Sequence, residues 1–333
     1  MLSFQPLPLL GNPHVQTILG NYLPGDRRTP RAKRWAVTLA DGDRIALSET
    51  GPRRRHPRQP LALLVHGLGG SHRSANMVRM TNRLSDLGWR VVRMDLRGAG
   101  AGVRLARRFY NAACSGDVRA VVRNLALCYP RAPLAVVGFS LGGNIALKLA
   151  GEIATKPLPS LVAVAAFGPP IDLVRCSEML ARQPIYDAFY ARNLTRQVTQ
   201  HEQCHPDIAR AVFPRNTTVR QFDELYTAPR WGYENALDYY RQASALPWLP
   251  HISVPTFILT ARDDPFVAVE PFENVGVPSA VEIHIAANGG HLGFLGADGL
   301  GGFRWAETQL AHWLEHQIMF ASPSQDWNNG PAH

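Results

Sequence analysis

The sequence predicts an α/β fold in which a mostly parallel β-sheet is covered by helices on both faces. Short runs of β-favouring residues, apolar enough to be buried on both faces, recur at 61–67, 90–95, 134–139 and 161–167. Helix-favouring stretches separate these runs, at about 74–87, 117–128 and 141–154. Strands that alternate with helices in this way form parallel sheets with helices on each side.

Length and composition fit one large domain of this class. The 333 residues are 46% hydrophobic and can bury one large core, and α/β domains often reach this length. No stretch approaches the roughly 20 apolar residues of a membrane span, and residues 1–6 lack the basic start and long apolar core of a secretory signal. The four cysteines have no paired spacing: Cys114, Cys128, Cys176 and Cys204. We therefore expect a cytoplasmic protein with reduced thiols and no integral membrane segment.

The N-terminal region is expected to begin with an irregular lead-in over residues 1–30, because its prolines limit helix formation. Residues 35–50 then indicate two short strands around Asp41-Gly42, a hairpin turn signal. Two basic runs, at 27–34 and 53–58, could attract anionic lipid, acyl-CoA or nucleic acid. Neither run has interleaved aromatics or a nucleic-acid motif, so we favour a solvated surface, with no nucleic-acid partner and at most weak association with an anionic membrane.

The run at 134–139 ends in Gly138-Phe139-Ser140-Leu141-Gly142, and a helix-favouring stretch follows at once. This pattern predicts a strand, a sharp turn with Ser140 at its tip, and a helix. Glycines suit the two flanking positions because a side chain there would clash in a tight turn with a closely packed helix. The arrangement is typical of a nucleophile elbow, which lifts a serine hydroxyl to where a base can take its proton.

Two later strand-like runs are followed by an acid and a base. The first leads to Asp263 and Asp264, and the second leads to Gly289-Gly290-His291. We expect His291 to accept the Ser140 proton and later to protonate the leaving group, while an acid orients its ring. Neighbouring residues on an extended chain point to opposite sides. We favour Asp264, which lies further past the strand, and Asp263 fits a turn-capping role.

The chain order of serine, acid and histidine is that of an α/β-hydrolase. Each candidate follows the end of a predicted strand, so the three can meet at one edge of the sheet. The run at 61–65 leads into a glycine-rich turn, His66-Gly67-Leu68-Gly69-Gly70. We expect the backbone N–H groups of Leu68 and Leu141 to form the oxyanion hole. This chemistry needs no cofactor and no metal, and His201, Cys204 and His205 fit no zinc motif.

A change of pattern after Gly168 indicates an insertion. Residues 172–250 carry no strong β run, have helical tendency and are rich in aromatic side chains. They fall between the strand after the elbow helix and the strand that bears the acid, where hydrolases commonly insert a lid that excludes water and builds the acyl pocket. We expect a core of residues 1–171 and 251–320, a helical lid over 172–250, and a flexible tail over 321–333.

Six sequence blocks resemble the YheT-like branch of the α/β-hydrolases, which includes the EMB8-like and ABHD3-like proteins. They are Asn12-Pro13-His14-Val15-Gln16-Thr17, Val65-His66-Gly67-Leu68-Gly69-Gly70, Asp95-Leu96-Arg97-Gly98, Gly138-Phe139-Ser140-Leu141-Gly142-Gly143-Asn144, Asp263-Asp264-Pro265 and Gly289-Gly290-His291-Leu292-Gly293-Phe294. The resemblance runs from about residue 4 to about residue 318. It implies a hydrolase or acyltransferase acting on esters or thioesters, with Ser140, one of the two aspartates and His291 as the triad.

These observations together predict a serine hydrolase that cleaves carboxylic esters or thioesters of short- to medium-chain acyl groups through an acyl-enzyme intermediate. One alternative is an acyltransferase that passes the acyl group to an alcohol, because the hydration of the pocket decides the acceptor. Another is a non-catalytic binding protein on the same fold, because a fold does not guarantee an activity. The expected partner is a small acyl ester or thioester.

Overall fold

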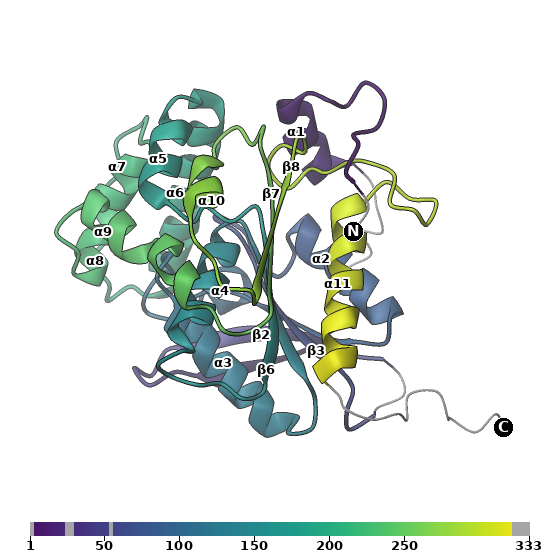
Figure 1. Ribbon diagram of the computed structural model, residues 1–333. Coiled ribbons are helices and arrows are strands. Elements are labelled where there is room, and N and C mark those ends of the chain that lie inside the picture. The colour runs from purple at the N-terminus through teal and green to yellow at the C-terminus, as the bar shows by residue number, and fades with distance from the viewer. Residues whose placement is uncertain (1–2, 24–29, 53–55, 322–333) are drawn as a thin grey trace.

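An eight-stranded β-sheet forms the centre of the molecule (Figure 1). The computed structural model describes residues 3–23, 30–52 and 56–321. The strands lie in the order β1-β2-β4-β3-β5-β6-β7-β8. Their bounds are Lys33–Thr38, Arg44–Thr50, Leu61–Val65, Arg90–Met94, Leu134–Phe139, Leu161–Phe167, Thr256–Ala261 and Val281–Ala286 for β1 to β8. From β4 to β8 all neighbours are parallel, and β2 runs antiparallel to both β1 and β4. The predicted parallel sheet and the predicted hairpin are both confirmed.

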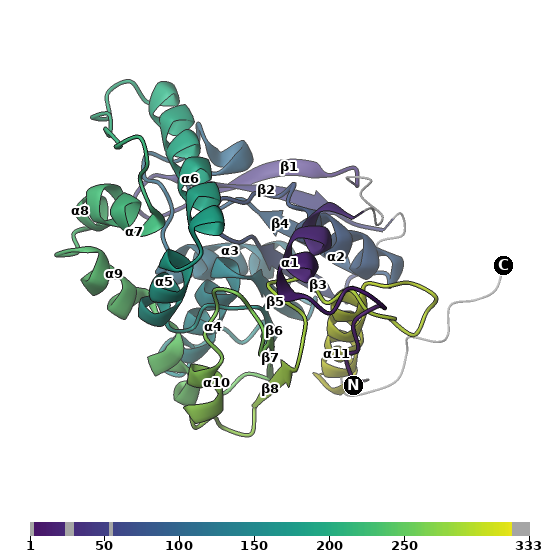
Figure 2. The same cartoon turned by 90° about the horizontal axis from the view of Figure 1, so that it is seen from above.

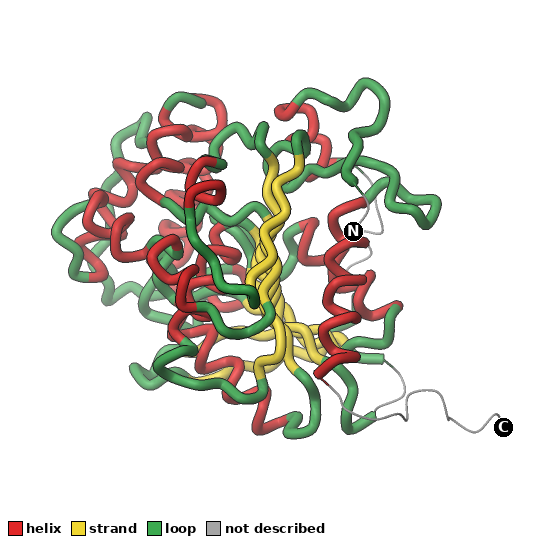
Figure 3. Tube along the Cα trace, viewed as in Figure 1, coloured by secondary structure: helices red, strands yellow, loops and turns green. Residues whose placement is uncertain are grey.

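Helices cover both faces of the sheet (Figures 1 and 3). Helices α2 (Ala75–Asp86) and α11 (Trp305–Ala321) pack on one face, and α3 (Ser115–Cys128) and α4 (Leu141–Glu152) pack on the other. The alternation along β3 explains the two layers, because Leu63 joins the α3–α4 core and its neighbour Leu64 joins the α2–α11 core. The short helix α10 (Glu270–Asn274) connects β7 to β8.

The segment between β6 and β7 is helical, and we call residues 172–250 the helical insertion. It contains α5 (Leu173–Ala181), α6 (Pro184–Cys204), α7 (Val219–Phe222), a π-helical turn (Asp223–Thr227), α8 (Ala228–Trp231), α9 (Ala236–Ala243) and most of a 3₁₀ turn (Leu246–His251). Figure 2 shows α6 as the longest of these helices, extending away from the sheet. A lone π-helical turn is uncommon and often accompanies a functional site.

The expectation of an irregular lead-in over residues 1–30 is wrong, because helix α1 occupies Pro13–Tyr22. Proline is well tolerated here since it stands at the first helical position, where its missing N–H would have no intrahelical partner. The Asn12 side chain caps the helix by accepting hydrogen bonds from the N–H groups of His14 and Val15. Of the two basic runs, residues 27–29 and 53–55 lie outside the described residues, as does the predicted tail apart from Ala321.

Candidate active site

Ser140 lies at the tip of a sharp turn between β5 and α4. Its backbone has φ +50° and ψ −121°, a conformation that side-chain-bearing residues rarely adopt and that costs about 1–3 kcal/mol. The flanking glycines are required by space: a Cβ at Gly138 would lie 2.2 Å from the Gly142 carbonyl oxygen, and one at Gly142 would lie 2.3 Å from the Val65 carbonyl oxygen. A side chain at either flanking position would therefore clash with the backbone, as the sequence pattern predicted.

His291 connects Ser140 to Asp264 through two short hydrogen bonds. The Ser140 hydroxyl lies 2.9 Å from His291 Nε2, and His291 Nδ1 lies 2.7 Å from Asp264 Oδ2. A carboxylate only accepts, so Nδ1 carries the hydrogen and Nε2 is left to accept from the serine. Both His291 and Asp264 are buried. The structure therefore brings together the three side chains that the sequence pointed to.

The neighbouring aspartates have different partners. Asp264 Oδ1 accepts from the N–H groups of Phe266 and Val267 at 3.0 and 2.9 Å, so its carboxylate is oriented from both ends. Asp263 instead accepts from the Gly290 N–H at 2.9 Å and from the Asn288 side chain at 3.4 Å. Asp263 thus holds the loop that carries the histidine, and among the described residues it is Asp264, not Asp263, that bonds to the His291 ring.

Helix α1 supports the same histidine loop, which the sequence analysis did not anticipate. The Thr17 hydroxyl accepts a hydrogen bond from the His291 N–H at 2.9 Å and donates to the Pro13 carbonyl oxygen at 2.7 Å. The fit is close, because a Cβ at Gly290 would lie 2.3 Å from the Pro13 carbonyl oxygen. The Gln16 side chain accepts from the Leu295 N–H at 2.7 Å. The Asn-Pro-His-Val-Gln-Thr block stood out in the sequence. Its contact with the histidine loop could not be predicted, because the two segments lie far apart along the chain.

The glycine-rich turn after β3 packs directly against Ser140. A Cβ at Gly67 would lie 3.1 Å from the Ser140 Cβ. His66 shapes this turn: Nδ1 donates to the Gly67 carbonyl oxygen at 2.8 Å, and Nε2 accepts from the Leu96 N–H at 3.1 Å. Burial lowers the pKa of His66, so the ring is neutral near pH 7. In the described part of the chain the N–H groups of Leu68 and Leu141 donate no hydrogen bond, and Leu141 opens helix α4.

Two cavities meet at Ser140. The outer cavity, of about 610 Å³, is lined by residues of α1, of the glycine-rich turn and of α6, and by His291. The inner cavity, of about 100 Å³, lies between Ser140 and the helical insertion. Its lining is mainly apolar and includes Leu173, Leu180, Val219 and Phe266. A reacting group at Ser140 therefore has a wide approach on one side and a small apolar recess on the other.

A buried carboxyl group lines the inner cavity. Asp223, at the start of the π-helical turn, accepts a hydrogen bond from the Tyr240 hydroxyl at 2.7 Å. Burial raises the pKa of Asp223 to about 6, although hydrogen bonds from Thr227 and Tyr240 act in the opposite direction. The apolar recess thus has a carboxyl group in its wall.

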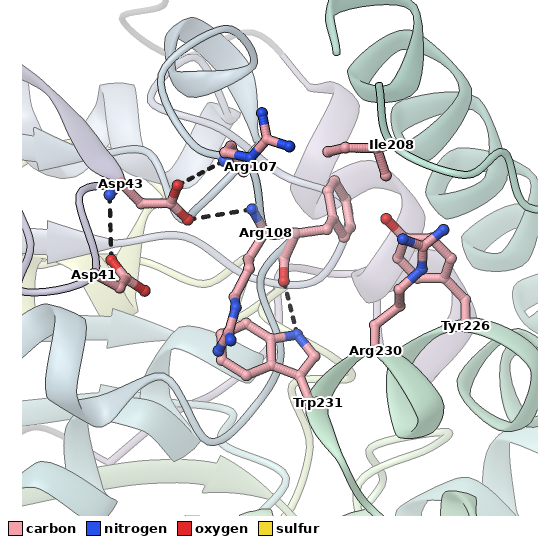
Figure 4. A pocket seen from close by; sticks show the side chains of 9 residues that line it. Asp41, Asp43, Arg107, Arg108, Ile208, Tyr226, Arg230 and Trp231 are labelled. Carbon is pink, nitrogen blue, oxygen red and sulfur yellow. Dashed lines mark hydrogen bonds between the residues drawn. The ribbon is translucent and has the colours of Figure 1, made fainter. Parts of the chain in front are cut away.

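A further cavity, of about 380 Å³, is lined by Arg108, Arg230, Trp231 and other residues (Figure 4). The Arg108 guanidinium lies over the Trp231 ring, 5.0 Å from its centroid. Asp43, in the same wall, accepts from the N–H groups of Arg107 and Arg108 and pairs with the buried Arg97, which also holds Asp117. These bonds bind the β1–β2 turn to the core.

The histidines of the helical insertion bond to backbone oxygens. His201 Nε2 donates to the Ala106 carbonyl oxygen at 2.8 Å, and His205 Nε2 donates to the Val103 carbonyl oxygen at 3.0 Å. They therefore attach α6 to the loop before α3. No group of three or more metal-ligating side chains is found within residues 3–23, 30–52 and 56–321. All four cysteines are unpaired.

A search for membrane-spanning helices in the described residues finds none of the required length and apolarity.

Comparison with known proteins agrees with this geometry. The pattern of the family described as alpha/beta hydrolase fold matches residues 60–298. YheT of Escherichia coli (strain K12), which is named as an esterase, is 32% identical over 320 residues, covering 94% of this chain and 93% of its own. Mouse phospholipase ABHD3 is 31% identical over 243 residues, covering 71% of this chain but only 59% of its own. A yeast monoacylglycerol lipase is 27% identical over 269 residues, with 77% and 59% covered.

Solved structures share the fold at low sequence identity. The Pyrococcus furiosus esterase Pf2001 superposes with a TM-score of 0.59 at 16% identity, covering 95% of this chain and 97% of its own. A 2,6-dihydroxy-pseudo-oxynicotine hydrolase gives a TM-score of 0.60 at 18% identity, covering 93% and 73%. From the family match and the YheT likeness together, the chain is a member of the α/β-hydrolase fold family, in the branch that contains the esterase YheT.

Proposed function

We propose that the protein is a serine esterase that hydrolyses carboxylic esters or thioesters of short- to medium-chain acyl groups. The observation that carries the proposal is the continuous hydrogen-bond chain from Asp264 through His291 to Ser140, at the meeting point of two cavities. Esterase and lipase relatives support ester hydrolysis in general terms. The order of groups is that required for a serine nucleophile with an oriented base.

The reaction begins when Ser140 Oγ attacks the ester carbonyl carbon and its proton passes to His291 Nε2. Negative charge develops on the carbonyl oxygen, and the N–H groups of Leu68 and Leu141 are the proposed donors that stabilise it. The intermediate collapses, the bond to the leaving oxygen or sulfur breaks, and His291 protonates the departing alcohol or thiol. Water then attacks the acyl-enzyme with His291 as base, which releases the acid and restores Ser140.

The two cavities suggest how the substrate lies. The inner, apolar cavity suits the acyl chain, since it borders Ser140 and is closed by the helical insertion. The outer cavity suits the leaving group, because it is larger and partly polar. On this reading the helical insertion acts as a lid, and α6 is bound to the glycine-rich turn by the hydrogen bond from the Gln197 side chain to the Gly69 carbonyl oxygen, 2.8 Å long.

A fluorophosphonate probe and a panel of p-nitrophenyl esters test the proposal. Wild-type protein should be labelled and should hydrolyse the esters, and Ser140→Ala should abolish both. Ser160→Ala is the matched control, because Ser160 lies just before β6, at the opposite edge of the sheet, and should leave both signals unchanged. A folded wild-type protein that neither labels nor hydrolyses any ester would favour a non-catalytic binding role.

Acyl transfer is resolved by the same panel. If an added alcohol raises the rate of p-nitrophenol release and yields the new ester, the acyl-enzyme prefers an alcohol acceptor. If the product is the free acid at every alcohol concentration, water is the acceptor. Thioester substrates with the same acyl groups show whether the oxygen or the sulfur leaving group is preferred.

A further inference from the structure

A cavity of about 350 Å³ lies beside the strands β1, β2 and β4 and has a strongly basic lining. Its polar lining residues are Arg31, Arg34, Ser48, His72, Arg73 and Arg93. None of them lines either cavity at Ser140. Because His72 and Arg73 lie between Gly70 and Ser74, which line the outer cavity, the two sites share one turn and no lining residue.

The sheet register builds the floor of this cavity. Arg34 on β1 pairs with Ser48 on β2, and Ser48 pairs with Arg93 on β4. Residues that pair across neighbouring strands point to the same face of a sheet, so the three form one row. The row continues to Leu64 on β3, which belongs to the apolar core beneath α2. The basic cavity therefore begins where the helical cover of this face ends.

His72 is held by a carboxylate and leaves one nitrogen without a partner. Its Nδ1 donates to Asp95 Oδ2 at 2.7 Å, and its backbone N–H donates to Asp95 Oδ1, also at 2.7 Å. His72 is 5% exposed and Asp95 is 1% exposed. His72 Nε2 is buried and has no hydrogen-bond partner in the described part of the chain. A ring fixed in this way presents Nε2 in one direction.

Arg93 shows the same feature. Its side chain is 1% exposed, and Nη1 donates to the His72 carbonyl oxygen at 3.0 Å. Its Nε is buried and, within the described residues, has no partner. Burial lowers the pKa of Arg93, whereas the charge of Asp95 acts in the opposite direction. A guanidinium remains charged under such conditions. A buried N–H without a hydrogen-bond acceptor is therefore unfavourable here, unless a bound ligand supplies the acceptor.

We propose that this cavity is a binding site for a phosphoryl group, carried by a small anion or by a lipid headgroup. Arg93 supplies a buried guanidinium, which matches the oxygens of a phosphate. His72 supplies a second nitrogen, which donates to a phosphate oxygen when protonated and accepts from a P–OH group when neutral. Arg31, Arg34 and Arg73 are exposed at the rim and add positive charge that a neutral ligand would not use.

Calorimetric titration with inorganic phosphate, at constant ionic strength against chloride, tests the site directly. Wild-type protein should show saturable binding. Arg34→Gln/Arg73→Gln removes two exposed rim charges without touching the core and should weaken binding at least about tenfold. Arg220→Gln/Arg241→Gln is the matched control, since it removes two exposed arginines from α7 and α9 and should bind phosphate as the wild type does.

Two further arms distinguish the sources of the phosphoryl group. Glycerol 3-phosphate that binds at least as well as phosphate indicates a soluble ligand. Vesicles of phosphatidylcholine with phosphatidic acid that bind only the rim-intact protein indicate a lipid headgroup. The proposal is overturned if phosphate, glycerol 3-phosphate and vesicles all fail to bind, or if the control variant loses binding as much as the rim variant. None of these readouts depends on ester hydrolysis.

Discussion

Ser140, His291 and Asp264 each combine a chemical group with an unusual local environment. Ser140 has a positive φ angle, His291 is followed by Leu292 with φ +60°, and Asp264 accepts two backbone N–H groups besides the histidine. Such features are stable only when the surrounding structure enforces them. The side chains are therefore oriented before a substrate arrives.

The two neighbouring aspartates give a sharp comparison. Asp264→Asn should lower kcat for ester hydrolysis about 10⁴-fold, because an amide can stabilise the wrong tautomer of His291. Asp263→Asn should lower it less than about tenfold, because the amide oxygen can still accept from the Gly290 N–H. Steady-state kinetics on one p-nitrophenyl ester decide the matter. Equal losses in the two variants would contradict the assignment of Asp264.

Asp223 should make stability depend on pH. Its pKa is raised from 3.8 to about 6, so the stability linked to its protonated form is present below pH 4 and is lost as the pH rises through 6. Relative to Asp223→Asn, the wild type should lose up to about 3 kcal/mol of unfolding free energy between pH 4 and pH 7. Urea unfolding at both pH values measures the difference. The exposed Glu234→Gln is the control and should show no such change.

At the scale of elements, α1 and the loop after β8 act as one unit although they lie at opposite ends of the chain. The Thr17 hydroxyl holds the His291 backbone, and Gly20 lies so close to Gly293 that a Cβ there would be 2.6 Å from the Gly293 Cα. Asp263 holds the same loop from the β7 side. The histidine loop is thus supported from two directions by groups that do not contact Ser140.

Thr17→Val tests this support. Loss of the hydroxyl leaves the His291 N–H without its acceptor, and we expect kcat to fall about tenfold as the ring loses its orientation. Thr17→Ser keeps the hydroxyl and should restore most of the activity. The rate of fluorophosphonate labelling should follow kcat in both variants. A Thr17→Val protein with unchanged labelling but a lower melting temperature would limit Thr17 to a structural role.

The inner cavity should set the preference for acyl chain length. Leu180→Phe places a larger side chain in its wall, so kcat/KM should fall more for hexanoyl than for acetyl esters, by about tenfold or more. Ile185→Phe is the matched control, because Ile185 lines the outer cavity and is 82% exposed. If both variants shift the preference equally, the acyl chain lies in the outer cavity.

At the scale of the whole molecule, local signals were predictable from the sequence and long-range partners were not. The elbow around Ser140 could be predicted because strand, turn and helix are adjacent and two glycines are sterically required. The choice of Asp264 over Asp263 rested on its position further past the strand end, and in the structure Asp264 makes the contact with the histidine. Helix α1 was not predicted because the prolines of residues 1–30 were taken to prevent helix formation wherever they stand. Asn12 as the cap and Pro13 at the first helical position in fact form a helix start.

Three buried or half-buried histidines should also make the stability of the whole fold depend on pH. Burial lowers the pKa of His66, His201 and His284, so the unfolded chain binds more protons than the folded one as the pH falls below about 6.5. The melting temperature should therefore decrease between pH 7 and pH 5, partly offset by Asp223. His201→Gln should flatten this decrease, since glutamine binds no proton there. The exposed His312→Gln should not.

The contact between α1 and the histidine loop has a consequence for biosynthesis. During translation, residues 13–22 are made well before the glycine-flanked segment at 289–294. Until that segment is made, helix α1 lacks the loop against which it packs. In the function proposed above, a chain that is still being translated, or is cut before residue 289, therefore contains the turn around Ser140 but not the histidine that Ser140 needs.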